Sequence, residues 1–344
     1  MNMVFIRRLE MPMEVKAAYP LTAELAAIAR RRMAEVADIL SGRDDRFLLI
    51  IGPCSADRED SVLEYLHRLR RLQEAVGESV YIVPRIYTNK PRTVGKGYMG
   101  LVHQPDPEEE PDLYSGLVAS RQLHMKALTE TGFTCADEML YPENIKYLDD
   151  LLCYVAVGAR SVENQQHRLT ASGLDQAVGM KNPTGGDLSV MLNAVETAQG
   201  AHAFIYRGWD ARSSGNPCAH CVLRGYTTRH GAAMPNYHYE DLLLLGTMYE
   251  ERQLKNPAVI IDTNHANSAK QPLEQARIAK EVLHSRRLNP AIRQLVKGLM
   301  VESYLADGSQ PVGGGRYGVS ITDPCLGWEK SERLVMELAE AVEK

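Results

Sequence analysis

Short hydrophobic runs alternate with longer amphipathic stretches along most of the chain, from Arg46 onward. The short runs have the length of buried β-strands, and the stretches have the periodicity of helices. The predicted strands lie near residues 47–51, 80–86, 133–137, 154–158, 177–180, 203–206, 258–262 and 296–301, and the predicted helices near 58–76, 113–131, 143–152, 187–199, 239–254 and 271–285. Strands that alternate with helices are typical of a parallel sheet. The pattern therefore predicts an α/β fold, a closed (β/α)8 TIM barrel.

Residues 1–45 precede the first predicted strand and form an N-terminal extension. They contain a helical stretch with Thr22 as a candidate N-cap and Gly42 as a candidate stop. We expect this extension either to cover the bottom of the barrel or to contact another subunit. Residues 46–344 are expected to form a single barrel domain, because a barrel often reaches this length without dividing.

Residues that can bind a metal or an anion recur where the hydrophobic runs end. Parallel strands of a barrel place such side chains together at their C-terminal ends. The long irregular stretches 87–112 and 207–238 follow predicted strands and should lie on the same face. The chain therefore predicts one site that is built from Cys54, Arg85, Glu138, Arg160, Lys181, Arg224, His265 and Glu302.

A thiol, an imidazole and two carboxylates form the first chemical group, namely Cys54, His265, Glu302 and Asp323. This donor set suits Mn, Fe, Co or Zn better than Mg or Ca. Taken singly, each residue has an ordinary structural interpretation, as a buried cysteine, a core histidine or a capping carboxylate. Burying all of them without partners would be costly, which favours a metal site.

Positive side chains form the second group, with Arg85, Lys90, Arg92, Arg160, Lys181 and Arg224 at or just after strand ends. Arginine matches carboxylate and phosphate in a bidentate manner, and lysine acts as a point charge. Their convergence predicts ligands with several negative charges, such as two phosphates and a carboxylate. Surface salt bridges are the alternative interpretation, and the strand-end positions argue against it.

The Cys218-Ala-His-Cys221 motif resembles half of a zinc site. A single CxxC without a partner pair is a weak signal. Residues 219–225 also have the pattern of a strand, with His220 and Val222 on one face and Cys221 and Leu223 on the other. A structural role is therefore favoured.

Bulk properties exclude several classes of protein. The formal net charge is −5, which gives no general basic field for nucleic acid. No hydrophobic stretch approaches the roughly 20 residues of a membrane span, and the N-terminus lacks the pattern of a secretory signal. The six cysteines are scattered, as expected of reduced thiols in the cytoplasm.

Several motifs in a fixed order resemble the class I family of 3-deoxy-D-arabino-heptulosonate 7-phosphate synthases. They are GPCS (52–55), KPRT (90–93), GARSVENQQHR (158–168), VGMKNPTGGDL (178–188), HANSAKQ (265–271), MVES (300–303) and SITDPCLGWE (320–329). The resemblance implies a (β/α)8 barrel with an N-terminal extension. It also implies a homo-oligomer, dimer or tetramer, that condenses phosphoenolpyruvate with erythrose 4-phosphate at the entry to the shikimate pathway, with a divalent metal.

The same resemblance assigns roles to individual residues. The family's metal ligands correspond to Cys54, His265, Glu302 and Asp323, and its phosphoenolpyruvate contacts to Arg85, Lys90, Arg160, Lys181 and Arg224. The motif that faces the aldose phosphate corresponds to Lys90, Pro91, Arg92 and Thr93. Cys54, Lys90, Glu138, Lys181 and His265 are the candidate catalytic residues. Lys90 is expected to protonate the new alkoxide, with a water on the metal as the alternative donor, and Glu138 to orient the attacking water or a cation.

Two other functions stay open. The first is the synthase that uses arabinose 5-phosphate to make the eight-carbon acid of lipopolysaccharide, but its family resembles a Lys-x-Asn motif where this chain has Lys90–Thr93. The second is a non-catalytic sensor of phosphorylated metabolites. Such a sensor would be expected to lose part of the site, whereas every position is present here.

Regulation by phenylalanine is expected to be weak or absent. Inhibited enteric members carry a serine where this chain has Asp175, and a small residue where it has the bulky Tyr206, which we place on the sixth strand. The loop between Tyr206 and Gly215 also looks shorter than the regulatory hairpin of those members. An acidic group, a large ring and a shorter hairpin all disfavour that binding mode.

Overall fold

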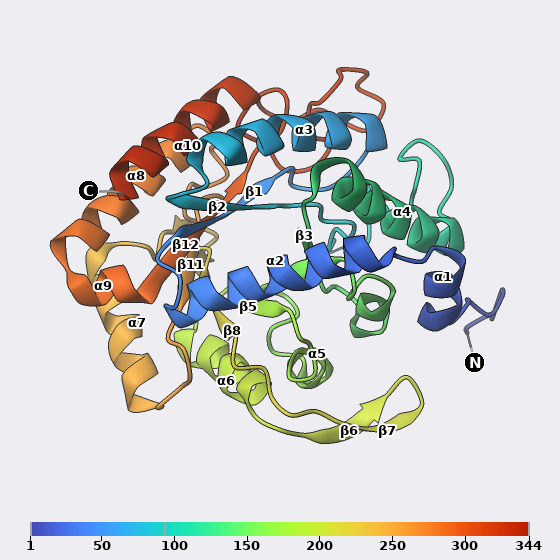
Figure 1. Cartoon of the computed structure of the whole chain (residues 1–344), viewed down its shortest axis with the longest axis horizontal. Coiled ribbons are helices and arrows are strands. Elements are labelled where there is room, and N and C mark those ends of the chain that lie inside the picture. Colours follow the sequence, from blue (N-terminus) through green and yellow to red (C-terminus); the bar gives the residue numbers. More distant parts are fainter. Residues whose placement is uncertain (1, 93, 343–344) are drawn as a thin grey trace.

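Eight parallel strands form a barrel in the computed structural model, which describes residues 2–92 and 94–342 (Figure 1). The strands follow the order β2-β1-β12-β11-β8-β5-β4-β3, and a bridge between Arg85 and Ala136 joins the two ends of this sheet. Their bounds are β1 (Phe47–Gly52), β2 (Val80–Pro84), β3 (Cys135–Glu138), β4 (Leu152–Val157), β5 (Ala177–Lys181), β8 (Ala219–Leu223), β11 (Val259–Asp262) and β12 (Val296–Glu302). The predicted TIM barrel is confirmed.

Helices surround this barrel (Figure 1). They are α3 (Glu59–Val76), α4 (Leu113–Thr131), α5 (Gln165–Ala171), α6 (Leu188–Gln199), α7 (Tyr239–Glu251), α8 (Glu274–Leu288), α9 (Pro290–Leu295) and α10 (Trp328–Val342). The helix predicted at 143–152 is only a short 3-10 helix, η1 (Pro142–Tyr147). The buried run of β4 already begins at Leu152 and leaves no room for further helical turns.

The sixth strand of the barrel differs from the prediction. Residues 203–206 were expected in the barrel, but β6 (Ala203–Tyr206) pairs antiparallel with β7 (Trp209–Arg212) in a hairpin outside it (Figure 1). Side chains of β6 are exposed or only partly buried, whereas every residue of β8 is buried. A barrel strand is covered on both faces, so the fully buried run takes this place.

Because β8 and not β6 is the sixth barrel strand, the barrel divides the stretch 207–238, which was expected to lie wholly on the catalytic face. Residues 207–218 precede β8 and lead into its N-terminal end, so this half of the prediction is wrong. Residues 224–238 follow β8 and carry a small ladder between β9 (Tyr226–Thr227) and β10 (Ala233–Met234). Arg224 and Thr227 line the cavity described below, as expected for this second half.

The N-terminal extension folds into α1 (Pro12–Ala18) and α2 (Ala23–Ser41), and α2 lies across the barrel (Figure 1). Thr22 accepts a hydrogen bond from the Leu25 amide, and Gly42 ends the helix with a φ of 78°, as the sequence predicts. Val36 and Ile39 are fully buried against side chains of the barrel interior. The helix therefore covers the bottom of the barrel, and a subunit contact by this extension stays a prediction.

The interior faces of the strands bury a mainly apolar cluster. His220 lies in it and contacts the hydroxyl of Tyr154 at 3.0 Å and the carbonyl of Cys218 at 2.8 Å. Val222 belongs to this interior cluster, while Cys221 packs on the outer face, as the strand pattern predicts. Within the described residues, no helix is both long and apolar enough to cross a membrane.

Candidate active site at the C-terminal end of the barrel

A cavity of about 380 Å³ opens at the C-terminal ends of the strands. Every predicted site residue that the structure describes lines it. They are Cys54, Arg85, Lys90, Pro91, Arg92, Glu138, Arg160, Lys181, Arg224, His265, Glu302 and Asp323. Thr93 lies outside the described residues. The strands bring together side chains that are far apart in the sequence.

Close packing of two strand ends positions the first of these residues. A Cβ on Gly52 would lie 2.4 Å from the backbone oxygen of Arg85, so only glycine allows β1 and β2 to approach this closely. Cys54 follows directly and is buried. Burial and the nearby Glu302 raise the pKa of the Cys54 thiol, which Lys90 and Arg85 partly oppose. A divalent metal would favour the thiolate.

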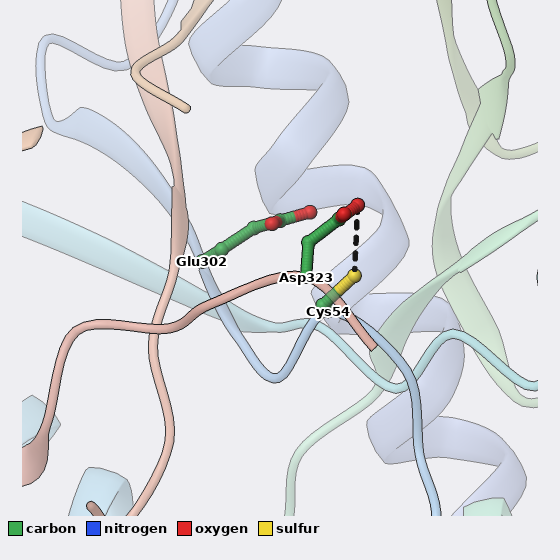
Figure 2. Close-up of side chains that lie close together, drawn as sticks. All are labelled: Cys54, Glu302 and Asp323. Carbon is green, nitrogen blue, oxygen red and sulfur yellow. Dashed lines mark hydrogen bonds between the residues drawn. The ribbon is translucent and has the colours of Figure 1, made fainter. Parts of the chain in front are cut away.

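Cys54, Glu302 and Asp323 place one ligand atom each within 4.8 Å of one another (Figure 2). The sulfur of Cys54 lies 3.6 Å from Oδ2 of Asp323. His265 stands at the edge of this group, with Nε2 at 3.9 Å from Oε1 of Glu302. Thiolate, carboxylate and imidazole donors together fit a borderline divalent ion.

The ammonium of Lys90 lies between two of these ligands. Its Nζ is 2.8 Å from the sulfur of Cys54 and 2.9 Å from Oδ2 of Asp323. Burial lowers the pKa of Lys90, but Cys54 and Asp323 outweigh it and the net direction is upward. The contact places a cation between two of the proposed metal ligands.

Asp262 ties the metal group to the anion-binding group. Its Oδ2 lies 2.8 Å from Nδ1 of His265 and 3.2 Å from Nζ of Lys181. Burial alone would raise the pKa of Asp262, but the nearby His265 and Lys181 lower it by more. The net pKa is below the usual value, so the carboxylate stays ionised. Contact through Nδ1 leaves Nε2 of His265 on the side of Glu302, the arrangement common in metal-binding histidines.

Asp262 and Lys270 were not predicted as site residues. Lys270 donates a hydrogen bond of 2.7 Å to Oδ1 of Asp323. Both stand within or next to motifs that the sequence displays, Asp262 as the last residue of a strand and Lys270 in HANSAKQ. Asp262 could have been predicted from its position at the C-terminal end of a strand, where functional side chains of a barrel gather. For Lys270, nothing in the neighbouring sequence indicates that Asp323 is its partner.

Arg85 contributes a buried donor at the floor of the cavity. Its Nη2 donates to Oε1 of Glu302 at 2.9 Å, and its guanidinium lies 3.8 Å from the ring centroid of Tyr87. Nη1 is buried without a hydrogen-bond partner in the described residues. An unsatisfied buried donor of this kind is costly unless a ligand accepts from it.

Arg160 and Arg224 also line the cavity. Neither makes an ion pair with a residue of segments 2–92 and 94–342. Burial lowers the pKa of Arg224, and Arg160 lowers it further, against an opposing effect of Asp262. Two arginines that repel each other next to a cavity form a site suited to a dianion.

Glu138, the last residue of β3, also lines the cavity. A Cβ on Gly158 would lie 2.4 Å from Oε1 of Glu138, so this glycine makes room for the carboxylate. The side chain has no ion pair with any residue that the structure describes, and it is 9% exposed. It is available to a ligand or water in the cavity.

Comparison with known proteins gives consistent matches over nearly the whole chain. Residues 18–336 match the model of the DAHP synthetase I family. The Tyr-sensitive phospho-2-dehydro-3-deoxyheptonate aldolase of Salmonella typhimurium is 38% identical over 337 residues, covering 95% of this chain and 91% of that protein. A Trp-sensitive counterpart from Enterobacter agglomerans is 36% identical over 339 residues, with 96% and 94% covered. A solved structure of phospho-2-dehydro-3-deoxyheptonate aldolase from Francisella tularensis superimposes with a TM-score of 0.91 at 30% identity and covers 99% of both chains.

Proposed function

The chain belongs to the DAHP synthetase I family of enzymes, and on that premise we propose that it condenses phosphoenolpyruvate with erythrose 4-phosphate. The products are 3-deoxy-D-arabino-heptulosonate 7-phosphate and phosphate, in the first step of the shikimate pathway. One observation carries the proposal: a single cavity of about 380 Å³ joins a group of metal-ligand side chains to several cations, of which Arg160 and Arg224 have no ion pair with any described residue. Two anionic substrates and a divalent ion match that combination of charges.

Phosphoenolpyruvate carries a phosphate and a carboxylate, and the cavity offers a pair of cations to each. Arg160 and Arg224 bind the phosphate, because both lack a carboxylate partner in the described chain. Arg85 and Lys181 bind the carboxylate from below, and the free Nη1 of Arg85 supports this orientation. The aldose phosphate lies along the loop of Lys90, Pro91 and Arg92, with Thr93 of the same motif as a further contact.

Cys54, His265, Glu302 and Asp323 would hold the divalent ion. When bound, it supplies Lewis acidity at the aldehyde oxygen of erythrose 4-phosphate. Mn, Fe, Co and Zn all suit the donor set. Asp262 orients His265, and Lys270 holds the second oxygen of Asp323, so the ligand side chains are fixed in advance.

The condensation proceeds in two stages. The methylene carbon of phosphoenolpyruvate attacks the aldehyde carbon, a C–C bond forms, and the alkoxide takes a proton from Lys90. Positive charge at C2 is then captured by a water that Glu138 orients, and the added water gives one proton to solvent. The hydroxyl that remains on C2 loses its proton as the C2–O bond to phosphate breaks, so that the ketone of the product forms and phosphate leaves, which makes the reaction effectively irreversible. Holding two like-charged substrates in a preorganised positive site supplies much of the acceleration.

The choice of aldose is tested by measuring phosphate release from phosphoenolpyruvate with each of two acceptors. With added Mn²⁺, we expect release with erythrose 4-phosphate to exceed release with arabinose 5-phosphate by at least about 100-fold, a difference of about 2.7 kcal/mol in transition-state binding. Release with arabinose 5-phosphate alone would identify the eight-carbon synthase instead. Tight phosphoenolpyruvate binding without release from either acceptor would identify a sensor.

A further inference from the structure

A second hollow, of about 980 Å³, lies at the opposite end of the barrel from the active-site cavity. The C-terminal end of α2, the segments that enter β1, β2 and β11, and the start of β12 form its walls. The α8–α9 connection closes one side. None of the residues assigned to catalysis or substrate binding lines it, so this hollow calls for an explanation of its own.

Besides Arg46, which pairs with Asp44, three cations line this hollow: Arg286 from α8, Arg293 from α9 and Lys297 from β12. None of them makes an ion pair within the part of the chain that the structure covers. The guanidinium of Arg286 lies over the ring of Phe47, the first residue of β1, at 4.5 Å from the ring centroid. Its Nε is buried and has no hydrogen-bond partner among the described residues.

Crowding of these cations is energetically unfavourable for the protein alone. Burial lowers the pKa of Arg286 to about 10, and Arg293 contributes in the same direction. Burial also lowers the pKa of Lys297, and Arg286 lowers it further, against a smaller opposing effect of Asp45. Desolvated like charges of this kind are stabilised when an anion accepts their hydrogen bonds.

The carboxylates around the hollow do not neutralise its cations. Asp44 accepts from Arg46, so its charge is already paired. Asp45, Glu78 and Glu250 are exposed to solvent, whereas Arg286 and Lys297 are partly buried. A ligand that enters this hollow therefore meets Arg286 and Lys297 at the more buried positions, and Arg293 together with these carboxylates at the exposed ones.

We propose that this hollow is a second ligand site, which binds a small anionic metabolite through a phosphate or carboxylate group held by Arg286, Lys297 and Arg293. The planar fork of Arg286 and the point charge of Lys297 form a pair suited to such a group. The site is distinct from the active-site cavity, because the two share no lining residue.

Calorimetric titration tests the proposal with inorganic pyrophosphate as a phosphate probe and citrate as a carboxylate probe. The chelator-treated wild type is compared with the double variant Arg286→Met/Lys297→Met. Each methionine removes one charge but keeps an unbranched side chain of related length. We expect at least one probe to bind the wild type at this hollow and the double variant to bind it at least about tenfold more weakly.

The matched control is Arg287→Met, which removes the neighbouring cation of α8 that lies in a different groove. We expect this variant to bind like the wild type. Arg160→Met distinguishes probe binding at the two sites, since it should weaken only binding at the active-site cavity.

Unchanged binding of both probes by the double variant would overturn the second site and leave the proposed condensation untouched. If the double variant does not fold, Lys297→Met alone should still weaken binding, and unchanged binding by it would overturn the site.

Discussion

The two ends of the same barrel bury very different side chains. At the C-terminal end, Arg85, Lys181, Asp262 and Glu302 are all buried and pair with one another around the cavity. At the N-terminal end, α2 places Val36, Ile39 and Leu40 against the apolar interior. The contrast indicates that stability depends mainly on the N-terminal end, which α2 covers, and that chemistry depends on the open C-terminal end.

Removing a cation from the open end should have the largest effect. Arg160→Met should lower kcat/KM for phosphoenolpyruvate about 10²–10³-fold, in the range found when one transition-state donor is lost. Because Arg160 is exposed and has no described ion-pair partner, the melting temperature should barely change. Steady-state kinetics checks this, with Arg71→Met as the control at an exposed arginine far from the cavity. Equal kinetics for the two variants would remove Arg160 from the phosphate site.

A truncation at the covered end should give the opposite result. Ile39 is 1% exposed on the buried face of α2. Ile39→Ala should lower the free energy of unfolding by about 2–4 kcal/mol and leave kcat of the folded protein within about twofold. Urea unfolding and initial rates measure the two quantities. A large loss of kcat at unchanged stability would show that α2 acts on the site.

His220 lies in the apolar interior of the barrel, and its titration tests how completely that interior excludes charge. Burial lowers the pKa of its imidazole to about 4, and the Cys218 carbonyl partly opposes this. The unfolded chain, with a histidine pKa near about 6.5, binds a proton that the folded state does not take up in this window. Stability should therefore fall as the pH drops from about 6.5 to about 4, by at most about 3 kcal/mol from this residue.

The matched variant for this prediction is His220→Gln, which keeps a polar side chain but does not titrate. Unfolding free energies at pH 7 and pH 5 should differ less for the variant than for the wild type. A difference equal to that of the wild type would mean that His220 takes up its proton in the folded state.

The smallest expected effect is that of phenylalanine. Asp175 is exposed, and Tyr206 lies in the β6–β7 hairpin with its hydroxyl donating to the Pro142 carbonyl at 2.8 Å. Both side chains keep the features that disfavour the enteric binding mode, although Tyr206 is not on a barrel strand as expected. Phenylalanine at about 1 mM should change the rate less than about twofold, whereas inhibition well below this concentration would contradict the prediction.

Much of the barrel could be predicted because its signals are local. Thr22 and Gly42 mark the ends of α2 through their own backbone preferences, and the buried runs mark the strands. The hairpin of β6 could not be predicted, since a short hydrophobic run does not reveal whether another layer covers it. Strand pairing and burial of both faces are properties of the whole sheet.

The site was predicted to a similar degree, and for a related reason. Strand ends and motifs indicated which side chains converge on the cavity. The contacts of Asp262 with His265 and of Lys270 with Asp323 depend on the relative positions of strand ends and loops, which spacing along the chain does not determine. Whether His265 joins Cys54, Glu302 and Asp323 around one ion stays a prediction.

Metal dependence of phosphate release tests the central claim most directly, that the open end combines a metal site with an anion site. Chelator-treated wild type, with phosphoenolpyruvate and erythrose 4-phosphate, should release no phosphate until Mn²⁺ is restored. Cys54→Ala should bind Mn²⁺ at least about tenfold more weakly and stay inactive while retaining its fold. Full phosphate release by the chelator-treated Cys54→Ala protein would contradict the account.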